Sequence, residues 1–566
     1  MPNPANPLIV QGDQSILLEV NHELYVPARD ALARFAELEK SPEYIHTYRI
    51  TPLSLWNAAS SGLKAADILG ALDYFSKYAL PSNVARDIED YVGRYGRVKL
   101  VRVGYDLLLD SEDPVLIAEI VRHKRIQPYL IEQINPHQVS VDPAMRGHIK
   151  QALVQIGYPA EDLAGYEDGE GLAIQLRLQT LGGLPFGLRQ YQREAAEIFH
   201  ASGSASGGSG AIVLPCGAGK TIVGMAAMAE LQTSTLILTP NTVAVRQWIS
   251  ELIDKTTLEP DQIGEYSGLT KEIRPVTIST YQIMTYRKRG TPKNSPQEYP
   301  HFKLFNARNW GLIVYDEVHL LPAPVFRVTA ELQARRRLGL TATLVREDGM
   351  ESDVFSLIGP KKYDVPWKDL EKQGWIATAM CHEIRIPMAE ERRMEYALAP
   401  QRQKYRVASG NPRKIPILDA LLEKHAGESI LIIGMYLEQL EKIAAKLDVP
   451  LITGKTKVRE REKLYEQFRV GEIKTLVVSK VANFSIDLPD ASVAIEISGT
   501  FGSRQEEAQR LGRILRPKKN GVMANFYTIV TRDTVDQTFA ANRQRFLTEQ
   551  GYKYEIRYED EVLNGN

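Results

Sequence analysis

The sequence predicts an α/β protein with two parallel-sheet domains in tandem, preceded by small α+β N-terminal domains. From about residue 185, short β-rich runs alternate with helical patterns, as expected for parallel strands joined by crossover helices. A second series of the same kind begins near residue 428. The chain has 566 residues, too many for one hydrophobic core, so we expect roughly two to four domains.

The first expected domain covers residues 1–110. Its patterns predict a strand at 15–20, helices at 28–40, 52–59, 65–78 and 83–95, and a hairpin at 98–110. Thr51 and Pro52 suit the N-cap and the first position of the second helix. The last three of these helices, followed by the hairpin, are typical of a winged helix, a common DNA-binding unit, and equally of a small protein-docking domain. The sequence leaves both interpretations open.

The second expected domain covers residues 111–180. Helical patterns at 114–123 and 146–156 flank two strand-like runs, which predicts a compact α+β unit. The acidic, glycine-containing passage at 161–171 then indicates a linker to the parallel-sheet domains.

Composition excludes several classes of protein. Lys and Arg total 69 against 70 Asp and Glu, a net charge of −1, so a nucleic acid would have to bind local basic surfaces. No apolar run reaches the roughly 18–20 residues that span a bilayer, and no secretory signal is visible. Only Cys216 and Cys381 are cysteines, which excludes a disulfide framework and a cysteine zinc site. We expect no membrane association and a cytoplasmic location, associated with the nucleoid in a prokaryote.

The segment 211–221, AIVLPCGAGKT, predicts a phosphate-binding loop. An apolar run leads into a glycine-rich turn and then a helical pattern, an arrangement that directs backbone N–H groups toward a polyphosphate. Lys220 is expected on the β- and γ-phosphates, and the Thr221 hydroxyl on Mg²⁺. The strict form of the motif has glycine where this chain has Leu214. The expected loop residues are Pro215, Cys216, Gly217, Ala218, Gly219, Lys220 and Thr221.

A pair of carboxylates follows another apolar run. Asp316 and Glu317 lie where a buried strand ends, the side of a parallel sheet on which ligands bind. Asp316 can hold Mg²⁺, directly or through water, and Glu317 can orient and deprotonate the attacking water. A single acidic strand end is common, but this pair together with a phosphate loop indicates hydrolysis of a nucleoside triphosphate.

Two further motifs complete the pattern. Thr341 and Thr343 close another strand, where small hydroxyl groups could relay the state of the phosphate. In the second α/β series, Gln509 precedes Arg513 and Arg516, two arginines on one helical face. Arginines placed in this way stabilise the charge of a transferring γ-phosphoryl group, with effects of roughly 10³–10⁵ on rate.

Taken in order, Gly-x-Gly-Lys-Thr, Asp-Glu-x-His, Thr-Ala-Thr and Gln-x-x-Gly-Arg-x-x-Arg resemble the motifs of superfamily 2 helicases, which have two RecA-like domains. The passages GLTATLVREDG, SKVANFSIDLP and EEAQRLGRILRP sharpen the match. They resemble the xeroderma pigmentosum group B (XPB) family of DNA repair helicases. The resemblance extends to PLIVQGDQSILLEV near the N-terminus, so it covers nearly the whole chain.

The resemblance implies a domain arrangement and further roles. Residues 181–360 would form the ATP-binding RecA-like domain, 361–566 the second RecA-like domain, and 111–180 a damage-recognition-like domain. By match to the family motifs, Arg189 and Gln192 would read adenine, Thr239 and Thr280 would touch a nucleic-acid backbone, and Arg513 and Arg516 would be arginine fingers. His319, Thr341, Thr343, Arg346, Glu347, Asp348, Lys480 and Asp487 match motifs for coupling or duplex opening.

Two departures from the family pattern stand out. Ala482 and Asn483 occupy positions where close relatives tend to have Gly-Asp. The family's thumb insertion is represented only by residues 391–416, with seven Lys or Arg, two Glu and the aromatic Tyr396 and Tyr405. Such a composition suits a surface that follows a backbone and stacks bases, and equally a solvated basic helix.

We therefore expect an ATP-dependent DNA helicase or translocase that uses Mg²⁺. The resemblance implies 3′→5′ polarity, a role in DNA repair or transcription, and a protein partner for the N-terminal domains, either a nuclease or a transcription and repair complex. Two alternatives stay open: a double-stranded DNA translocase that never separates strands, and a scaffold that docks DNA or partners without ATP turnover.

Overall fold

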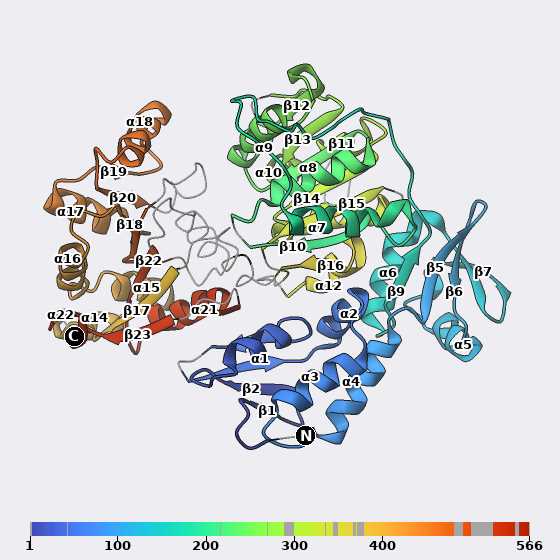
Figure 1. Ribbon diagram of the computed structural model, residues 1–566, viewed down its shortest axis with the longest axis horizontal. Helices are drawn as coiled ribbons and strands as arrows, with labels where there is room; N and C mark the ends of the chain where they lie inside the picture. The colour runs from blue at the N-terminus through green and yellow to red at the C-terminus, as the bar shows by residue number, and fades with distance from the viewer. Residues whose placement is uncertain are drawn as a thin grey trace.

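The computed structural model describes most of the chain. The described residues are 3–41, 44–215, 217–268, 270–287, 299–333, 335–342, 344, 349–365, 370, 379–479, 491–499, 524–549 and 554–564. Within these residues the strands form four sheets, of four, five, seven and seven strands (Figure 1). Both seven-stranded sheets are parallel, which confirms the predicted tandem α/β architecture with smaller units before it.

The first unit is a four-stranded antiparallel sheet packed against helices. Its elements are β1 (Leu8–Val10), β2 (Ser15–Glu19), α1 (Tyr25–Leu32), β3 (Glu37–Lys40), β4 (Ile45–Arg49), α2 (Pro52–Ser60), α3 (Ala65–Phe75) and α4 (Ser82–Arg94), with strand order β1-β2-β4-β3. The expected cap is present, since the Thr51 hydroxyl accepts from the Ser54 amide (3.0 Å).

The prediction of one helix over 28–40 is wrong in its second half. Helix α1 ends at Leu32, and β3 occupies 37–40 as an edge strand. Leu38 lies opposite Tyr48 on β4, and both side chains are buried in the core of this unit. Pairing with a neighbouring strand and burial of one side chain therefore outweigh the helical propensity of this stretch.

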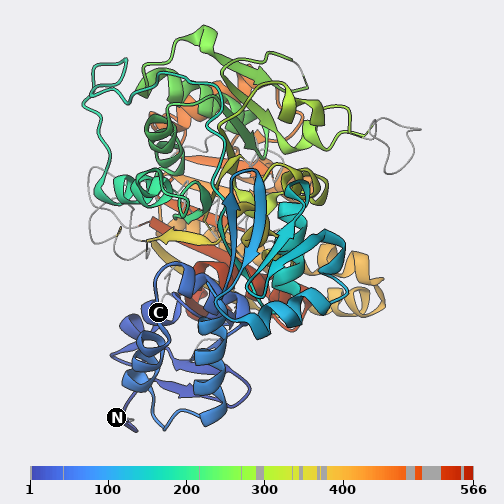
Figure 2. The same ribbon diagram turned by 90° about the vertical axis from the view of Figure 1, so that its right-hand side faces the viewer.

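The second unit is a five-stranded sheet with strand order β7-β8-β6-β5-β9. Its elements are β5 (Val98–Val103), β6 (Asp106–Asp110), α5 (Pro114–Arg122), β7 (Leu130–Asn135), β8 (Gln138–Val141), α6 (Arg146–Gln155) and β9 (Ala160–Leu163). Figure 2 looks onto this sheet, with the four-stranded unit below it.

The hairpin over 98–110 forms as predicted, but it is the centre of this second sheet. Strand β6 pairs with β8, and β5 pairs with β9. Its apolar side chains, among them Leu100 and Leu109, pack with those of α5 and α6. The first unit therefore lacks the wing of a winged helix, and the first residues of the predicted linker at 161–171 form part of β9.

The third unit is the first parallel sheet, with strand order β12-β13-β11-β14-β15-β10-β16. Its elements are α7 (Gln190–His200), β10 (Ser209–Val213), α8 (Lys220–Leu231), β11 (Thr235–Thr239), α9 (Thr242–Lys255), β12 (Ile263–Tyr266), β13 (Val276–Thr280), α10 (Tyr281–Met284), β14 (Leu312–Asp316), α11 (Ala323–Glu331), β15 (Arg336–Thr341), α12 (Glu351–Asp353) and β16 (Lys361–Asp364). Strand β16 pairs with β10, so this sheet includes residues just beyond the expected boundary at 360.

The fourth unit is the second parallel sheet, with strand order β19-β20-β18-β21-β22-β17-β23. Its elements are β17 (Ala379–Ile386), α14 (Glu390–Leu398), α15 (Gln401–Ser409), α16 (Lys414–Lys424), β18 (Ile430–Gly434), α17 (Leu437–Leu447), β19 (Leu451–Ile452), α18 (Val458–Arg469), β20 (Thr475–Ser479), β21 (Val493–Glu496), β22 (Ala524–Thr531), α21 (Val535–Glu549), β23 (Tyr554–Tyr558) and α22 (Glu559–Leu563).

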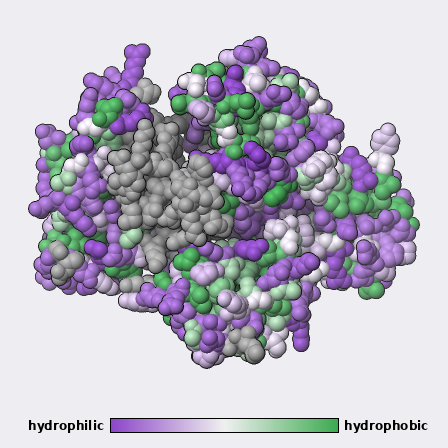
Figure 3. Space-filling model, in the orientation of Figure 1, coloured by the Kyte–Doolittle hydropathy of each residue, from purple (hydrophilic) through white to green (hydrophobic). Residues whose placement is uncertain are grey.

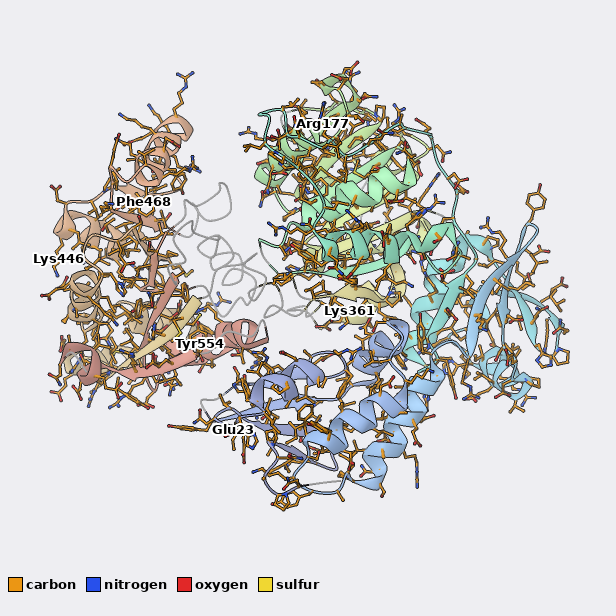
Figure 4. The ribbon with its side chains drawn as sticks, in the orientation of Figure 1. Glu23, Arg177, Lys361, Lys446, Phe468 and Tyr554 are labelled. Atoms are coloured by element: carbon orange, nitrogen blue, oxygen red, sulfur yellow. The ribbon has the colours of Figure 1, made fainter. Side chains whose placement is uncertain are left out.

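The four-stranded unit touches both parallel-sheet domains (Figure 1). Helix α2 lies against β16, where the Asn57 side-chain oxygen accepts from the Lys361 amide (2.9 Å). Figure 4 labels Lys361 at this position, directly beside α2. On its other side, the edge strand β3 lies against α21 of the second parallel-sheet domain.

Figure 3 shows hydrophilic and hydrophobic side chains mixed over both parallel-sheet domains, and a group of hydrophobic side chains at the outer end of the five-stranded unit. Val103 and Ile131 of this unit are exposed. Among the described residues, none of the helices combines the length and apolar character needed to cross a lipid bilayer.

Candidate functional site

The predicted phosphate loop connects β10 to α8 at the carboxyl edge of the first parallel sheet. Gly217 and Gly219 have φ of 81° and 82°, a left-handed conformation that glycine adopts without strain. Space imposes the same choice, because a Cβ on Gly219 would lie 2.5 Å from Gln192 Nε2. Helix α8 begins at Lys220, so its N-terminal N–H groups are at the loop, as anion binding requires.

Helix α7 holds the loop from outside. The Tyr191 hydroxyl and Gln192 Nε2 both donate to the Ala218 carbonyl, at 2.7 and 3.0 Å. Gln192 Oε1 accepts from the Arg189 amide (3.0 Å), and Arg189 Nη1 donates to the Tyr191 hydroxyl (3.0 Å). Arg189 and Gln192 therefore lie beside the phosphate loop, and their contact with adenine stays a prediction. Tyr191, which completes this support, was not predicted from the sequence.

Lys220 and Glu317 form an ion pair across the site. Their charged atoms are 3.0 Å apart, and the side chains are 11% and 13% exposed. Burial would raise the pKa of Glu317, but Lys220 and His319, together with the Ala342 backbone amide, lower it overall. Glu317 has φ of 49°, a left-handed conformation that is uncommon outside glycine and typical of functional positions. The carboxylate is thus ionised and held by its neighbours.

Asp316 ends β14 next to Glu317. Burial and the adjacent Glu317 charge raise its pKa, and a hydrogen bond from Trp248 Nε1 to Asp316 Oδ2 (3.0 Å) opposes that rise. Two carboxylates side by side in a partly enclosed site repel each other, and a divalent cation relieves that repulsion.

His319 links the carboxylates to the neighbouring strand. Its Nδ1 is 2.6 Å from the Thr341 hydroxyl and 3.5 Å from Glu317 Oε2. The Thr341 carbonyl accepts from the Leu214 amide (2.9 Å), directly before the phosphate loop. Predicted residues from three separate motifs therefore meet at one point of the sheet edge. Leu214, where the strict motif has glycine, is buried in the core.

Thr239 and Thr280 lie opposite each other at the ends of β11 and β13. Both are buried, and their hydroxyls are used within the protein. Thr239 donates to the Ser279 carbonyl (3.2 Å), and Thr280 accepts from the Ile283 amide (3.2 Å) at the start of α10. In this structure the two side chains shape the strand ends, and their contact with a nucleic-acid backbone stays a prediction.

Several predicted residues lie outside the part of the chain that the structure describes. They are Cys216 in the phosphate loop, Thr343, Arg346, Glu347, Asp348, Lys480, Asp487, Gln509, Arg513 and Arg516. Their roles stay as the family resemblance implies.

Residues 391–416 correct part of the thumb hypothesis. Tyr405 is buried and donates to the Gly499 carbonyl (2.6 Å), so it cannot stack on a base. The Tyr396 hydroxyl accepts from the Val535 amide (2.9 Å). Lys414 is fully buried against Asp536 (2.9 Å), which removes one of the seven basic residues from the surface. Composition had identified the basic stretch but could not show which side chains face inward.

The residues at the site fit a magnesium–nucleotide complex. Oε2 of Glu317 is buried and has no hydrogen-bond partner among the described residues. A buried acceptor of this kind is costly unless a ligand or water completes its hydrogen bonds. The loop supplies backbone N–H groups for phosphates, Lys220 a cation, and Thr221 and Asp316 the oxygen ligands that Mg²⁺ prefers.

Comparison with known proteins gives the family. The domain described as "ERCC3/RAD25/XPB C-terminal helicase" matches residues 370–564. "Type III restriction enzyme, res subunit" matches 185–346, and "Helicase conserved C-terminal domain" matches 8–135. A Mycobacterium tuberculosis protein named DNA 3'-5' helicase XPB is 56% identical, covering 98% of each chain. The chain belongs to the XPB family of DNA helicases.

Two further relatives show the breadth of the XPB family. A Kineococcus radiotolerans protein, also named DNA 3'-5' helicase XPB, is 55% identical over 99% of this chain and 98% of its own length. An Enterocytozoon bieneusi protein named "General transcription and DNA repair factor IIH helicase/translocase subunit XPB" is 35% identical over 99% of this chain and 94% of its own. The similarity to XPB proteins thus includes the four- and five-stranded units.

Proposed function

We propose that this XPB-family chain is a 3′→5′ DNA helicase of repair, driven by ATP and Mg²⁺ at the carboxyl edge of the first parallel sheet. The observation that carries the assignment of the site is the Lys220–Glu317 pair, with a buried carboxylate oxygen beside a phosphate loop. Such a site suits hydrolysis of a γ-phosphate, in which the protein positions groups and offsets charge.

The residues take the following roles. The loop amides and Lys220 would hold the phosphates, and Thr221 and Asp316 would hold Mg²⁺, which when bound would offset phosphate charge. Lys220 is paired with Glu317 in this structure, so phosphate and carboxylate compete for it. When Lys220 turns toward phosphate, Glu317 loses its partner and becomes a stronger base, able to accept a proton from the attacking water. Binding of phosphate thereby prepares the base.

From the second parallel-sheet domain, Arg513 and Arg516 would offset charge that develops on the phosphate, with Gln509 beside them. Cycles of hydrolysis would move the two parallel-sheet domains toward and away from each other. The surfaces that bind nucleic acid would then step along a strand.

Replacement of the base tests the site. Glu317→Gln keeps size and shape but cannot take up the proton, so we expect ATP to bind and DNA-stimulated ATP turnover to be abolished. Turnover is measured with and without single-stranded, duplex and forked DNA. Wild-type turnover in Glu317→Gln would show that the base is misassigned.

A second candidate function is movement along double-stranded DNA without strand separation. It is favoured by the name "helicase/translocase subunit" of the related Enterocytozoon bieneusi protein. A forked duplex with a fluorophore–quencher pair reports strand release, and displacement of a third strand reports translocation. Helicase action predicts ATP-dependent release from the fork. Third-strand displacement without release from the fork would replace the helicase assignment by translocation.

The N-terminal units are proposed to dock a partner protein, either a nuclease or a transcription and repair complex. The Enterocytozoon bieneusi relative carries the name of a factor IIH subunit. Removal of residues 1–95, the four-stranded unit, should abolish a partner's effect on ATP turnover, measured with purified components. An unchanged effect would show that this unit does not dock the partner.

A further inference from the structure

Two buried aromatic side chains donate hydrogen bonds to Asp316. The Trp248 indole Nε1 donates to Oδ2 of the side chain at 3.0 Å, and the Tyr281 hydroxyl donates to the backbone carbonyl at 2.8 Å. Trp248 is 1% exposed and Tyr281 is 4% exposed. One donor therefore fixes the rotation of the carboxylate, and the other fixes the backbone that carries it.

The two donors come from neighbouring parts of the sheet. Trp248 lies on α9, which follows β11 and Thr239, and Tyr281 begins α10 directly after Thr280. Strands β13, β11 and β14 are adjacent, and Thr239 lies opposite Thr280. Each donor therefore belongs to the helix that follows a threonine which the family resemblance assigns to a nucleic-acid strand.

The Trp248 ring is also confined by α8. A Cβ added to Gly224 on that helix would lie 2.5 Å from Cη2 of the indole, so only glycine admits the ring. Helix α8 starts at the phosphate loop. The indole thus lies between the phosphate-loop helix and Asp316, and a shift of α9 has to move the ring, the carboxylate or both.

We propose that Trp248 is a positioning residue that orients Asp316 toward a divalent metal, and that α9 and α10 transmit the position of a bound nucleic-acid strand to that carboxylate. This rests on the proposed function, in which Asp316 holds Mg²⁺. A carboxylate has about four lone-pair directions, so one indole hydrogen bond sets its orientation and leaves acceptors for the metal or its water. Partners that hydrogen-bond metal ligands typically contribute about 10–100-fold in metal affinity or activity.

The test compares two buried tryptophans. Trp248→Phe keeps most of the ring and removes the N–H donor. Trp310→Phe is the matched control, because Trp310 is also buried and its Nε1 donates to the Leu304 carbonyl (2.9 Å), away from Asp316. Full-length proteins are titrated with Mn²⁺ in the presence of ADP, and free Mn²⁺ is measured by electron paramagnetic resonance. In a second titration, ADP is added in the presence of a chelator, so that ADP binding is measured without metal.

We expect Trp248→Phe to weaken Mn²⁺ binding about 10-fold or more, as for loss of a hydrogen bond to a metal ligand, and to leave ADP binding in chelator unchanged. Trp310→Phe should match the unmodified protein in both measurements. A general loss of structure would weaken ADP binding as well, so the split between metal and nucleotide separates positioning from folding.

A second pair of variants tests the transmission step. Tyr281→Phe removes the hydroxyl that holds the Asp316 backbone, and we expect the ratio of DNA-stimulated to basal ATP turnover to fall several-fold. Tyr315→Phe is the control, since its hydroxyl lies 3.0 Å from the Thr329 hydroxyl on α11. Tyr315→Phe should keep the full ratio. If Trp248→Phe does not fold, Tyr281→Phe still tests the transmission step, and an unchanged stimulation ratio overturns the inference.

Equal Mn²⁺ affinity in Trp248→Phe and Trp310→Phe, or an unchanged stimulation ratio in Tyr281→Phe, overturns this inference. If the unmodified protein hydrolyses ATP and either result is found, this inference fails and the proposed function stands. If the unmodified protein neither binds Mn²⁺ with ADP nor hydrolyses ATP, the proposed function fails and takes this inference with it.

Discussion

Two lysine–carboxylate pairs, one in each parallel-sheet domain, use the same chemistry for different purposes. Lys414 and Asp536 are 2.9 Å apart and at most 1% exposed. Lys414 also donates to the Ile497 and Ile529 carbonyls, both at 2.7 Å, so all three of its N–H donors are used. Glu317, the partner of Lys220, keeps a buried oxygen without a hydrogen bond among the described residues.

The difference lies in how completely each pair is satisfied. A sealed and fully hydrogen-bonded pair fixes the packing around it, and separating its members exposes a buried charge. The Lys220–Glu317 pair lies at the carboxyl end of the sheet and has an unused acceptor, so either member can exchange its partner for a ligand. In these two pairs the nitrogen–oxygen distances are nearly equal, so the difference lies in the hydrogen bonds and not in the distance.

The largest expected effect on stability comes from breaking the sealed pair. Lys414→Met leaves Asp536 buried without its cation, which should lower the free energy of unfolding by about 3–5 kcal/mol. Denaturant unfolding with a probe in the second parallel-sheet domain measures the loss. Replacing both members, Lys414→Met with Asp536→Leu, should recover only part of it, because the Ile497 and Ile529 carbonyls still lack their donor. A single variant as stable as the unmodified protein would contradict the comparison.

Breaking the exchangeable pair should instead affect chemistry. Lys220→Ala removes the cation expected on the phosphates, so ATP turnover should fall by about 10²–10³-fold. The melting temperature should fall less than in Lys414→Met, because His319 and the Ala342 amide still stabilise the Glu317 carboxylate. Steady-state turnover and a thermal melt of the same sample give both values. A large loss of stability with turnover kept would reverse the roles of the two pairs.

A third pair, Lys150 and Asp162 (2.8 Å), lies between these cases. Burial lowers the pKa of Lys150 from 10.5 to about 7, although Asp162 opposes that shift. Between these values the unfolded chain holds a proton that the folded chain has lost. Stability should therefore rise with pH across this window, by at most about 1.4 kcal/mol per pH unit, and be lost as pH falls toward 7.

Lys150→Met removes that proton, so its stability should rise less with pH over the same window. Urea unfolding of both proteins at several pH values between 7 and 10 measures the two slopes. Parallel slopes would mean that Lys150 stays charged in the folded protein.

The smallest effect belongs to an exposed pair. Arg406 and Glu438 are 3.3 Å apart, and both side chains are about two-thirds exposed (67% and 65%). Glu438→Gln should leave the midpoint of denaturant unfolding almost unchanged, and still less affected in high salt, because solvent screens the charges. Denaturant unfolding at two salt concentrations checks this, and a midpoint that shifts as far as that of Lys414→Met would show that exposure alone does not rank these pairs.

The sequence predicted the parts of the site that depend on backbone chemistry. The spacing of residues along the chain was enough to predict these parts. Glycines between a strand and a helix predict a phosphate loop, and Asp316 with Glu317 after an apolar run predicts a pair of carboxylates at a strand end. Trp248 was not predictable, because a single aromatic residue in a helix indicates only a core position. Its partner becomes visible only once β14 and α9 are packed together.

The errors have the same origin. Composition predicted a basic, aromatic surface at 391–416, but Tyr405 and Lys414 face inward because their partners, Gly499 and Asp536, lie far along the chain. The helix expected over 28–40 gave way to β3 for the same reason, since its pairing with β4 is a tertiary contact. Local patterns specify what a segment can form, and distant partners decide which choice is made.

The contacts of the four-stranded unit have a mechanical consequence. With α2 on β16 and β3 against α21, the covalent chain and these contacts join the units into a closed linkage. In such an arrangement no single interface can change alone. Rotation of one parallel-sheet domain against the other must therefore shift or break the contact of α2 with β16 or that of β3 with α21. Strand β16 pairs with β10, which leads into the phosphate loop. A movement of α2 against β16 would therefore act on a strand that pairs directly with the strand before the glycine-rich loop.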